Sequence, residues 1–248
     1  IEDSRGNIWL STSRAGAICL KGDEHSPVYY LPTNSNICSD KINTIYEDRF
    51  GNIWIGSQDN GISVLNMETH TIVNYAHDPA DVNSLSSNKV FSFVELPYGN
   101  MLIGMIDGGI DLFDYSSKKF IRNYIPSVEG AFTLKEGKDN NVWIGTDGDG
   151  IYRLNADREV DRHYTADKLP AGVVLTIFED SRGRIWLGTY LHGLFLYDER
   201  SDSFQSIRLQ TGGREIKDIY IIEENTNGTL WIGTNENGLC LYNHDTKK

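Results

Sequence analysis

The pattern of apolar and polar positions repeats six times along the chain at a nearly constant spacing. Each copy has a glutamate, a short polar turn, an anchor residue seven positions after the glutamate, and a glycine seven positions after the anchor. The anchors are 45, 48, 41, 43 and 45 residues apart, and a period of about 40 to 45 residues is typical of one four-stranded propeller blade. The pattern predicts an all-β fold, a β-propeller segment over residues 1–248 built from about six four-stranded blade repeats. The anchors are Trp9, Trp54, Leu102, Trp143, Trp186 and Trp231.

The second copy shows how one repeat maps onto four strands, named a to d. Asp48-Arg49-Phe50-Gly51 has the composition of a tight turn, because aspartate accepts backbone hydrogen bonds and glycine allows positive φ. The run Ile53-Trp54-Ile55 places apolar side chains on both faces of strand b, so we expect each blade to pack between two others. The expected strands are residues 42–47, 52–57, 61–65 and 71–75.

The first and last copies are incomplete. The first begins at the end of its strand a, and the sixth reaches Lys248 before any strand d. We therefore expect the chain to be an incomplete part of a seven-bladed propeller or of a pair of them. A missing stretch of roughly 20 to 25 residues would close six blades, and a further blade would close seven.

The recurring glutamates allow two interpretations. A ring of carboxylates can hold a cation in the central channel of a propeller. A residue present in every repeat more simply meets a need of every repeat, so we predict that each glutamate fixes the turn before strand b and that the chain has no metal site. The tryptophans could likewise stack on sugars, but their place in an apolar strand predicts core packing.

Composition limits the partners of the chain. Hydrophobic residues make up 39% of it, enough for a large core, and no run approaches the ~18 apolar residues of a membrane helix. The net charge is −12 and no basic cluster is present, so direct nucleic-acid binding is not expected. The three cysteines lack metal or disulfide spacing, and no cofactor is predicted.

Three phrases of the chain carry a family resemblance. Residues 83–90 read Asn-Ser-Leu-Ser-Ser-Asn-Lys-Val and lead into an expected strand a. Residues 51–56 read Gly-Asn-Ile-Trp-Ile-Gly, and residues 60–66 read Asn-Gly-Ile-Ser-Val-Leu-Asn. This pattern resembles the two-component-regulator propeller repeat, which forms the periplasmic sensor region of hybrid two-component systems, and it covers essentially the whole chain.

The resemblance implies an architecture and a function. Such sensors usually pair two seven-bladed propellers and continue into a β-sandwich, a membrane helix, a histidine kinase and a response regulator. It therefore implies a periplasmic location in an inner-membrane protein, with a homodimer and the rest of the sensor chain as partners. The ligand implied is an oligosaccharide or another carbohydrate breakdown product. No kinase motif occurs in these residues, so the segment itself is predicted to be non-enzymatic.

Two alternative functions remain open. One is a carbohydrate-active or lyase-type propeller enzyme, because streptogramin-type lyases also carry Gly-x-Ile-Trp in their repeats. Such a reaction needs a general base, and the histidines are scattered without metal-ligand spacing, so no catalytic residue is assigned. The other alternative is a purely structural propeller.

Positions that differ between repeats are where a ligand site is expected. In an up-and-down blade, the b–c loops and the d-to-a crossings share one face, opposite the a–b and c–d turns. Tyr190 and His192 are the first choice, because this b–c loop alone projects an aromatic ring beside an imidazole. Further candidates are Arg14, Gln58, Asp59, Asp147, Asp149, Asn235 and Glu236 in b–c loops, and His77 and Asp78 in a crossing.

Overall fold

The fold consists of small antiparallel sheets that follow one another along the chain. A computed structural model describes residues 1–22, 26–97, 99–137 and 139–246. The chain divides into two compact units, Ile1–Ala131 and Phe132–Lys248, which are described separately. Among the described residues, no helix is long and apolar enough to span a membrane.

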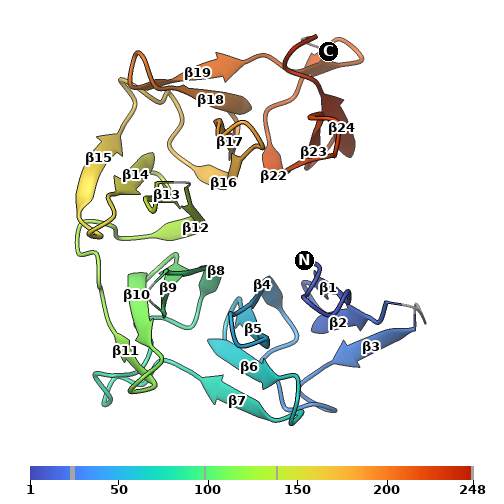
Figure 1. The fold of residues 1–248 in the computed structure, drawn as a ribbon, viewed down its shortest axis with the longest axis vertical. Helices are drawn as coiled ribbons and strands as arrows, with labels where there is room; N and C mark the ends of the chain where they lie inside the picture. The colour runs from blue at the N-terminus through green and yellow to red at the C-terminus, as the bar shows by residue number, and fades with distance from the viewer. Residues whose placement is uncertain (23–25, 98, 138, 247–248) are drawn as a thin grey trace. The chain divides into compact units, whose positions relative to one another are not determined.

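Unit 1 contains blades 1 to 3 (Figure 1). Blade 1 has three strands in the order β1-β2-β3, and blades 2 and 3 have four each. The strands are β1 (Ile8–Ser11), β2 (Ala17–Leu20), β3 (Pro27–Tyr30), β4 (Ile42–Glu47), β5 (Asn52–Ser57), β6 (Ile62–Asn66), β7 (Ile72–Tyr75), β8 (Val90–Glu95), β9 (Asn100–Met105), β10 (Gly109–Asp114) and β11 (Lys119–Ile121).

Unit 2 contains blades 4 to 6, with the first strand of blade 4 beginning at Ala131. Blades 4 and 5 have four strands, blade 6 has three, and a two-stranded hairpin that the sequence did not predict precedes blade 6. The strands are β12 (Ala131–Glu136), β13 (Val142–Thr146), β14 (Ile151–Leu154), β15 (Val160–Tyr164), β16 (Val174–Glu179), β17 (Ile185–Thr189), β18 (Leu194–Asp198), β19 (Ser203–Ile207), β20 (Gln210–Thr211), β21 (Arg214–Glu215), β22 (Ile219–Glu224), β23 (Leu230–Thr234) and β24 (Leu239–Tyr242).

The structure confirms the predicted all-β blade architecture. In blade 2, strands β4 and β5 have the predicted bounds, and β6 and β7 each begin one residue later than predicted. Blades 1 and 6 lack strands a and d respectively, although Glu2 still forms an isolated bridge to Ile8. The seven-blade total stays a prediction.

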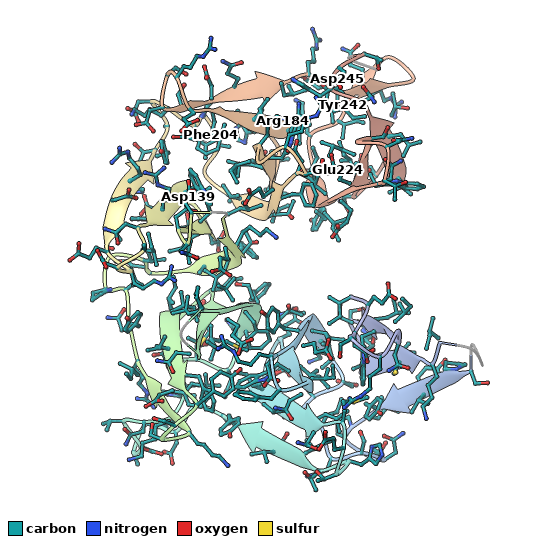
Figure 2. All side chains as sticks on the ribbon, viewed as in Figure 1. Asp139, Arg184, Phe204, Glu224, Tyr242 and Asp245 are labelled. Atoms are coloured by element: carbon teal, nitrogen blue, oxygen red, sulfur yellow. The ribbon has the colours of Figure 1, made fainter. Side chains whose placement is uncertain are left out.

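Four of the five tryptophan anchors are buried in the core between adjacent blades, as predicted. Trp54 packs against Phe113 of blade 3 with ring centroids 5.0 Å apart, and Trp143 packs against Tyr197 of blade 5 at 5.2 Å. Trp186 is covered by Tyr242 of blade 6, which Figure 2 labels. Each of these three tryptophans is therefore sealed by strand c of the next blade.

Trp231 departs from this prediction. Its residue surface is 40% exposed, whereas the equivalent Trp186 is 0% exposed. The ring lies on the face of blade 6 that also exposes Leu241, its cross-strand neighbour, and Leu239. Because no ring of unit 2 covers that face as Tyr242 covers Trp186, Trp231 is not a core residue of this unit.

The turn before strand b is held by its first residue, an aspartate, as the composition of Asp48-Arg49-Phe50-Gly51 predicted. Asp48 Oδ1 accepts from the backbone N–H groups of Phe50 and Asn52, both at 2.9 Å. Its Oδ2 accepts from Trp54 Nε1 at 2.8 Å. The carboxylate therefore fastens the turn to the core anchor, and the a–b turn needs no glutamate of its own blade.

The glutamates instead join neighbouring blades. Glu47 of blade 2 accepts from the backbone N–H and the hydroxyl of Ser4 in blade 1, at 2.7 and 2.6 Å. Glu224 of blade 6 accepts from Ser181 N and Oγ in blade 5, at 2.7 and 3.1 Å. Glu47 and Glu224 thus hold a turn before a strand b, as predicted for the recurring glutamate, but that turn belongs to the preceding repeat.

Candidate functional site

Within each unit, the b–c loops lie beside the d-to-a crossings. In blades 1, 2, 4 and 5, the glycine that ends the b–c loop donates its backbone N–H to a carbonyl of the crossing that leads into the next blade. These pairs are Gly16 to Asp40 at 2.8 Å, Gly61 to Asn88 at 2.9 Å, Gly150 to Gly172 at 3.1 Å and Gly193 to Lys217 at 2.8 Å. The variable loops and crossings are thus fixed to one another, as the sequence predicted for this face.

The recurring glycine is required by geometry. Gly61 has φ +84°, and a Cβ placed on it would lie 2.2 Å from the carbonyl oxygen of Tyr75. Gly150 has φ +70° and the same distance to Tyr164 O. Any side chain here would collide with the last residue of strand d, so glycine is needed for the b–c loop to reach the crossing.

Asp149 in the b–c loop of blade 4 forms a polar cluster with Tyr152 of β14 and His163 of β15. Tyr152 Oη donates to Asp149 Oδ2 at 2.5 Å, and His163 Nε2 lies 3.3 Å from Asp149 Oδ1. His163 Nε2 also lies 2.9 Å from the carbonyl oxygen of Asp149. The imidazole stacks on the Tyr152 ring with centroids 3.8 Å apart and an interplanar angle of 10°. The cluster therefore presents an oriented imidazole and an exposed carboxylate at the surface.

Tyr190 and His192 lie beside the same crossing as this cluster. The backbone of Asp147 forms an isolated bridge to Val173, and Tyr190 N donates to Val173 O at 3.1 Å. The Tyr190 residue is 43% exposed, while His192 Nδ1 lies 3.0 Å from Tyr190 O. The structure thus brings the blade 4 loop and the blade 5 loop to the two sides of Val173.

Asn235 and Glu236 occupy the b–c loop of blade 6, and both are exposed. Asn235 N donates to Asp218 O at 3.4 Å, and Leu191 N donates to Asp218 Oδ1 at 2.8 Å. Asp218 in the crossing therefore links the b–c loops of blades 5 and 6. This places five of the candidates, Asp147, Asp149, Tyr190, His192 and Asn235, in one continuous series of loops and crossings in unit 2.

The candidates from unit 1 serve local structure. Asp59 accepts from Ser39 Oγ at 2.6 Å and from Lys41 Nζ at 2.7 Å, and the Lys41 hydrogen bond holds the pKa of Asp59 below its ordinary value. Blade 3 repeats the ion pair between Lys89 and Asp107. The backbone N–H of Gln58 donates to Lys41 O at 2.9 Å. Arg14 is exposed.

His77 and Asp78 are fixed within the long crossing before blade 3. His77 Nδ1 lies 2.6 Å from Leu85 O, and Arg122 Nη2 donates to Asp78 O at 2.7 Å. Asp111, fully buried, accepts from Ser86 N and Oγ, each at 2.7 Å. Burial raises the pKa of Asp111. These contacts make the crossing a rigid loop anchored from strand c of blade 3.

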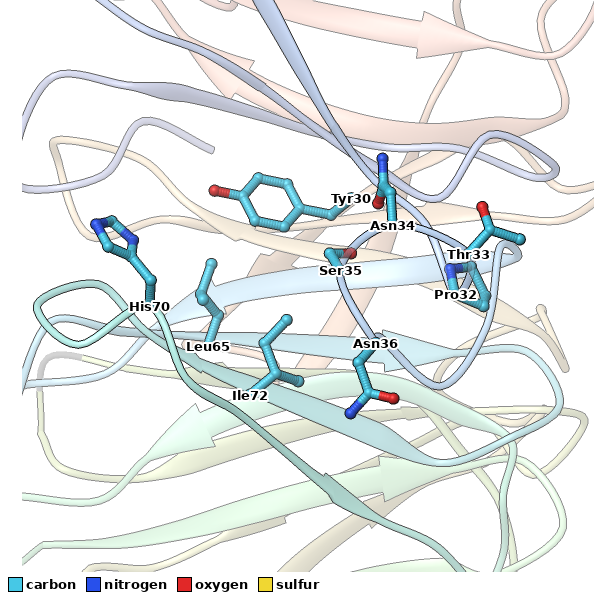
Figure 3. A pocket seen from close by; sticks show the side chains of 9 residues that line it. All are labelled: Tyr30, Pro32, Thr33, Asn34, Ser35, Asn36, Leu65, His70 and Ile72. Carbon is cyan, nitrogen blue, oxygen red and sulfur yellow. The ribbon is translucent and has the colours of Figure 1, made fainter.

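A groove of about 560 Å³ lies at the outer edge of blades 1 and 2 (Figure 3). Tyr30, Leu65 and Ile72 form its apolar part, and Asn34 and Asn36 bring amides to it. The Asn34 amide already donates from Nδ2 to Tyr29 O at 2.9 Å, and the backbone carbonyl of Asn36 accepts from Asn74 Nδ2 at 2.9 Å. A related groove beside Tyr75 and Phe120 recurs between blades 2 and 3, so this feature follows from the blade geometry.

Sequence reasoning missed Tyr152 and His163. Tyr152 lies two residues after the b–c glycine, at the position of Ser63 in blade 2 and Asp111 in blade 3. His163 is its register partner on strand d. Both could have been found by aligning the repeats on that glycine and pairing strands c and d, since the position holds a different residue in each blade. Among the described residues, no cluster of three His, Cys, Asp or Glu side chains could hold a metal ion.

The chain is a β-propeller whose sequence repeats match a known family. Residues 36–59 and 168–191 match the family described as two component regulator propeller. The chain is similar to Histidine kinase P4 of Formosa agariphila, with 34% identity over 93 residues that make up 32% of the chain. The chain therefore carries two-component regulator propeller repeats, as the resemblance predicted.

Solved structures agree on the fold. The extracellular domain of the hybrid two component system BT3049 from B. thetaiotaomicron superimposes with a TM-score of 0.83 at 25% identity over 99% of the chain. Virginiamycin B lyase from Staphylococcus aureus gives a TM-score of 0.73 at 16% identity over 98% of the chain, which shows the shared fold alone. The chain spans 7% of the kinase and 33% of the BT3049 extracellular domain.

Proposed function

We propose that the chain is a non-enzymatic sensor propeller of a hybrid two-component protein, located outside the cytoplasm and anchored through the rest of its chain in the inner membrane. Its repeats and its likeness to the BT3049 extracellular domain support this function and location. The ligand class we propose is an oligosaccharide or another carbohydrate breakdown product.

The observation that carries the ligand proposal is the Asp149–Tyr152–His163 cluster beside Tyr190. Other blades have no such arrangement at this position among the described residues, since Ser63 and Asp111 bind crossings there. A carboxylate, an imidazole and an exposed phenol ring supply hydrogen-bond acceptors, a donor and a stacking surface, which is what a sugar requires.

The proposal is tested in membranes that contain the intact protein. Phosphorylation of the kinase is measured with and without a panel of oligosaccharides, in wild type and in the Tyr190→Ala and His163→Ala variants. We expect a saccharide to change phosphorylation in wild type and this response to be lost in both variants. A response of equal size in the variants would remove this face from the signalling site.

Dimerisation through the same face is the second part of the proposal. Analytical ultracentrifugation of the intact extracellular region is expected to show a dimer that Tyr190→Ala weakens. A monomer at all concentrations, or an unchanged dimer, would contradict it.

A lyase is the competing function, and the observation that favours it is the pairing of His163 with Asp149, which is suited to a general base. Mass spectrometry of the oligosaccharides after incubation separates the two functions. A sensor returns them unchanged, and an enzyme returns products.

A further inference from the structure

The turn before strand b is built differently in blade 4. In blades 1, 2 and 5 the anchor indole donates to an aspartate six residues earlier. The three distances are all 2.8 Å, for Trp9 to Asp3, Trp54 to Asp48 and Trp186 to Asp180. In blade 4 the residue six before Trp143 is Gly137, so this carboxylate is missing.

Two polar groups at this turn have no hydrogen bond to any residue in the described ranges 99–137 and 139–246. No hydrogen bond joins Trp143 Nε1 to any of the described residues, and Asn141 Oδ1 is buried without a partner among them. In blade 2 the equivalent Asn52 Nδ2 donates to Asp48 Oδ2 at 3.0 Å. A Cβ on Gly137 would lie 3.5 Å from Trp143 Nε1 and 2.3 Å from Asn141 Oδ1. The indole donor and the amide acceptor therefore both lie next to the place where blades 1, 2 and 5 have an aspartate side chain.

A groove of about 400 Å³ opens at this position, between blades 4 and 5 of unit 2. Gly137, Asn141 and Trp143 line it from blade 4, with Arg153 from strand c of that blade, and Tyr197 lines it from blade 5. Figure 2 labels Asp139 and Arg184, two further lining residues. The groove lies on the side of the a–b turns, so it is distinct from the Asp149–Tyr152–His163 cluster in the b–c loops.

The charges of the groove favour a neutral occupant. All three lining arginines already have carboxylate partners: Arg153 with Asp161 at 2.7 Å, Arg182 with Asp245 at 2.6 Å and Arg184 with Asp180 at 2.6 Å. Asp139, Glu179 and Glu199 add negative charge to the lining. An anionic ligand would therefore meet repulsion without a free cation to offset it.

We propose that this groove binds a neutral polyhydroxylated ligand of the sugar class. One ligand hydroxyl accepts from Trp143 Nε1–H and donates its proton to Asn141 Oδ1, because a hydroxyl can do both at once. It thereby satisfies the two groups that Gly137 leaves unpaired. The site shares no residue with the proposed sensor face, so the two proposals are tested independently.

The experiment follows the indole ¹H–¹⁵N signals of the five tryptophans in the ¹⁵N-labelled full chain during titration with maltose or cellobiose. The Trp143 signal is assigned by its absence in Trp143→Phe. We expect it to shift saturably, while the signal of Trp54, sealed by Asp48, stays in place. Glucuronate is expected to cause no shift at the same concentrations.

The key variant is Gly137→Asp, which supplies the carboxylate that blades 1, 2 and 5 have. Gly137 is not among the glycines with positive φ, so its backbone suits aspartate. We expect this variant to lose saccharide affinity by about tenfold or more, because the carboxylate takes the Trp143 Nε1 hydrogen bond and the new Cβ, 2.3 Å from Asn141 Oδ1, displaces the Asn141 amide. Urea denaturation confirms that the variant is folded.

Three results would overturn the proposal. They are no shift of the Trp143 signal with any neutral sugar, an equal shift with glucuronate, or an unchanged shift in Gly137→Asp. The first of these, together with an ordered water between Trp143 and Asn141 in a crystal structure, would assign the groove to water only. If the Trp143 signal shifts with sugar as expected, but no saccharide changes phosphorylation of the kinase in the intact protein, the sensor function is overturned and this binding site is retained.

Discussion

The carboxylate of Glu47 in blade 2 accepts two hydrogen bonds from Ser4 in blade 1, at 2.7 Å from its backbone N and 2.6 Å from its hydroxyl. The two residues are 43 positions apart, about one repeat. Arg49 of blade 2 makes the same type of contact with Glu95 of blade 3, through its backbone N at 2.9 Å. Glu47 and Glu95 are therefore inter-blade clamps, as is Glu224 in unit 2.

Replacing this clamp should weaken the packing of adjacent blades. We expect Glu47→Ala to lower the free energy of unfolding by about 1 to 2 kcal/mol, because two charge-assisted hydrogen bonds are lost at a partly exposed site. Urea denaturation of wild type and Glu47→Ala measures this difference in the free energy of unfolding. Glu68→Ala, in an exposed c–d turn, is the matched control and should change stability by less than about 0.5 kcal/mol. Equal effects of the two variants would contradict the clamp.

The tryptophan anchors should differ in their importance. Trp186→Ala is expected to cost about 3 to 5 kcal/mol, because it leaves a large cavity between blades 5 and 6. Trp231→Ala should cost much less, since this residue is 40% exposed. Thermal denaturation and folded yield of both variants test this difference. A similar loss in the two would mean that the exposed face of blade 6 is covered in the folded protein.

Acid should release a contact in blade 5. Asp202 accepts from Tyr164 Oη at 2.7 Å, and this hydrogen bond, with those from Tyr197 and Lys168, lowers the pKa of Asp202 to about 2. An unfolded aspartate titrates near pH ~3.9, so the folded state binds fewer protons between these values. The contribution of Asp202 to the free energy of unfolding is present above about pH 4 and is lost as the pH falls toward about 2.

The test compares wild type with Asp202→Asn between these pH values. The asparagine variant should be less stable at neutral pH, and its stability should depend less steeply on pH over the acid range. Asp157→Asn, in an exposed turn, is the control. Identical slopes for wild type and Asp202→Asn would show that the contact does not form in the folded protein.

The long crossing before blade 3 should depend on Asp111. This carboxylate is fully buried and accepts from Ser86 N and Oγ and from Asn123 N. We expect Asp111→Ala to cost about 2 to 3 kcal/mol, because buried donors lose their acceptor. Faster amide hydrogen exchange confined to residues 76–88 is the specific measurement. Unchanged exchange in that crossing would contradict the anchoring role.

Sequence periodicity was sufficient for the strands and most of the core. The apolar run around Trp54 predicted a buried strand b because both of its faces carry apolar side chains, and Ile53 and Ile55 are fully buried. The periodicity could not say which turn Glu47 holds, since a contact with its own repeat and one with the neighbouring repeat give the same pattern. The unpredicted exposure of Trp231 reflects its neighbours in space, which the local sequence does not contain.

The candidate site could be predicted only in part. The Tyr190 loop was found because its composition differs from the other b–c loops. His163 was missed because strand d shows no regular repeat, and its contact with Asp149 depends on the cross-strand register with Tyr152. The ion pair of Asp59 with Lys41 could not be predicted, because Lys41 lies 18 residues away in the preceding crossing.

The central claim is that the b–c loop face of blades 4 and 5 binds a carbohydrate. Its most direct test is isothermal calorimetry of an oligosaccharide panel with the intact extracellular region and its Tyr190→Ala, His192→Ala and His163→Ala variants, with Asp59→Asn as the matched control. We predict that wild type and the control bind one saccharide with equal affinity. Tyr190→Ala and His163→Ala should bind about tenfold more weakly, since a stacking or hydrogen-bonding contact is lost. Unchanged affinity in all three site variants, with folding intact, would contradict the account.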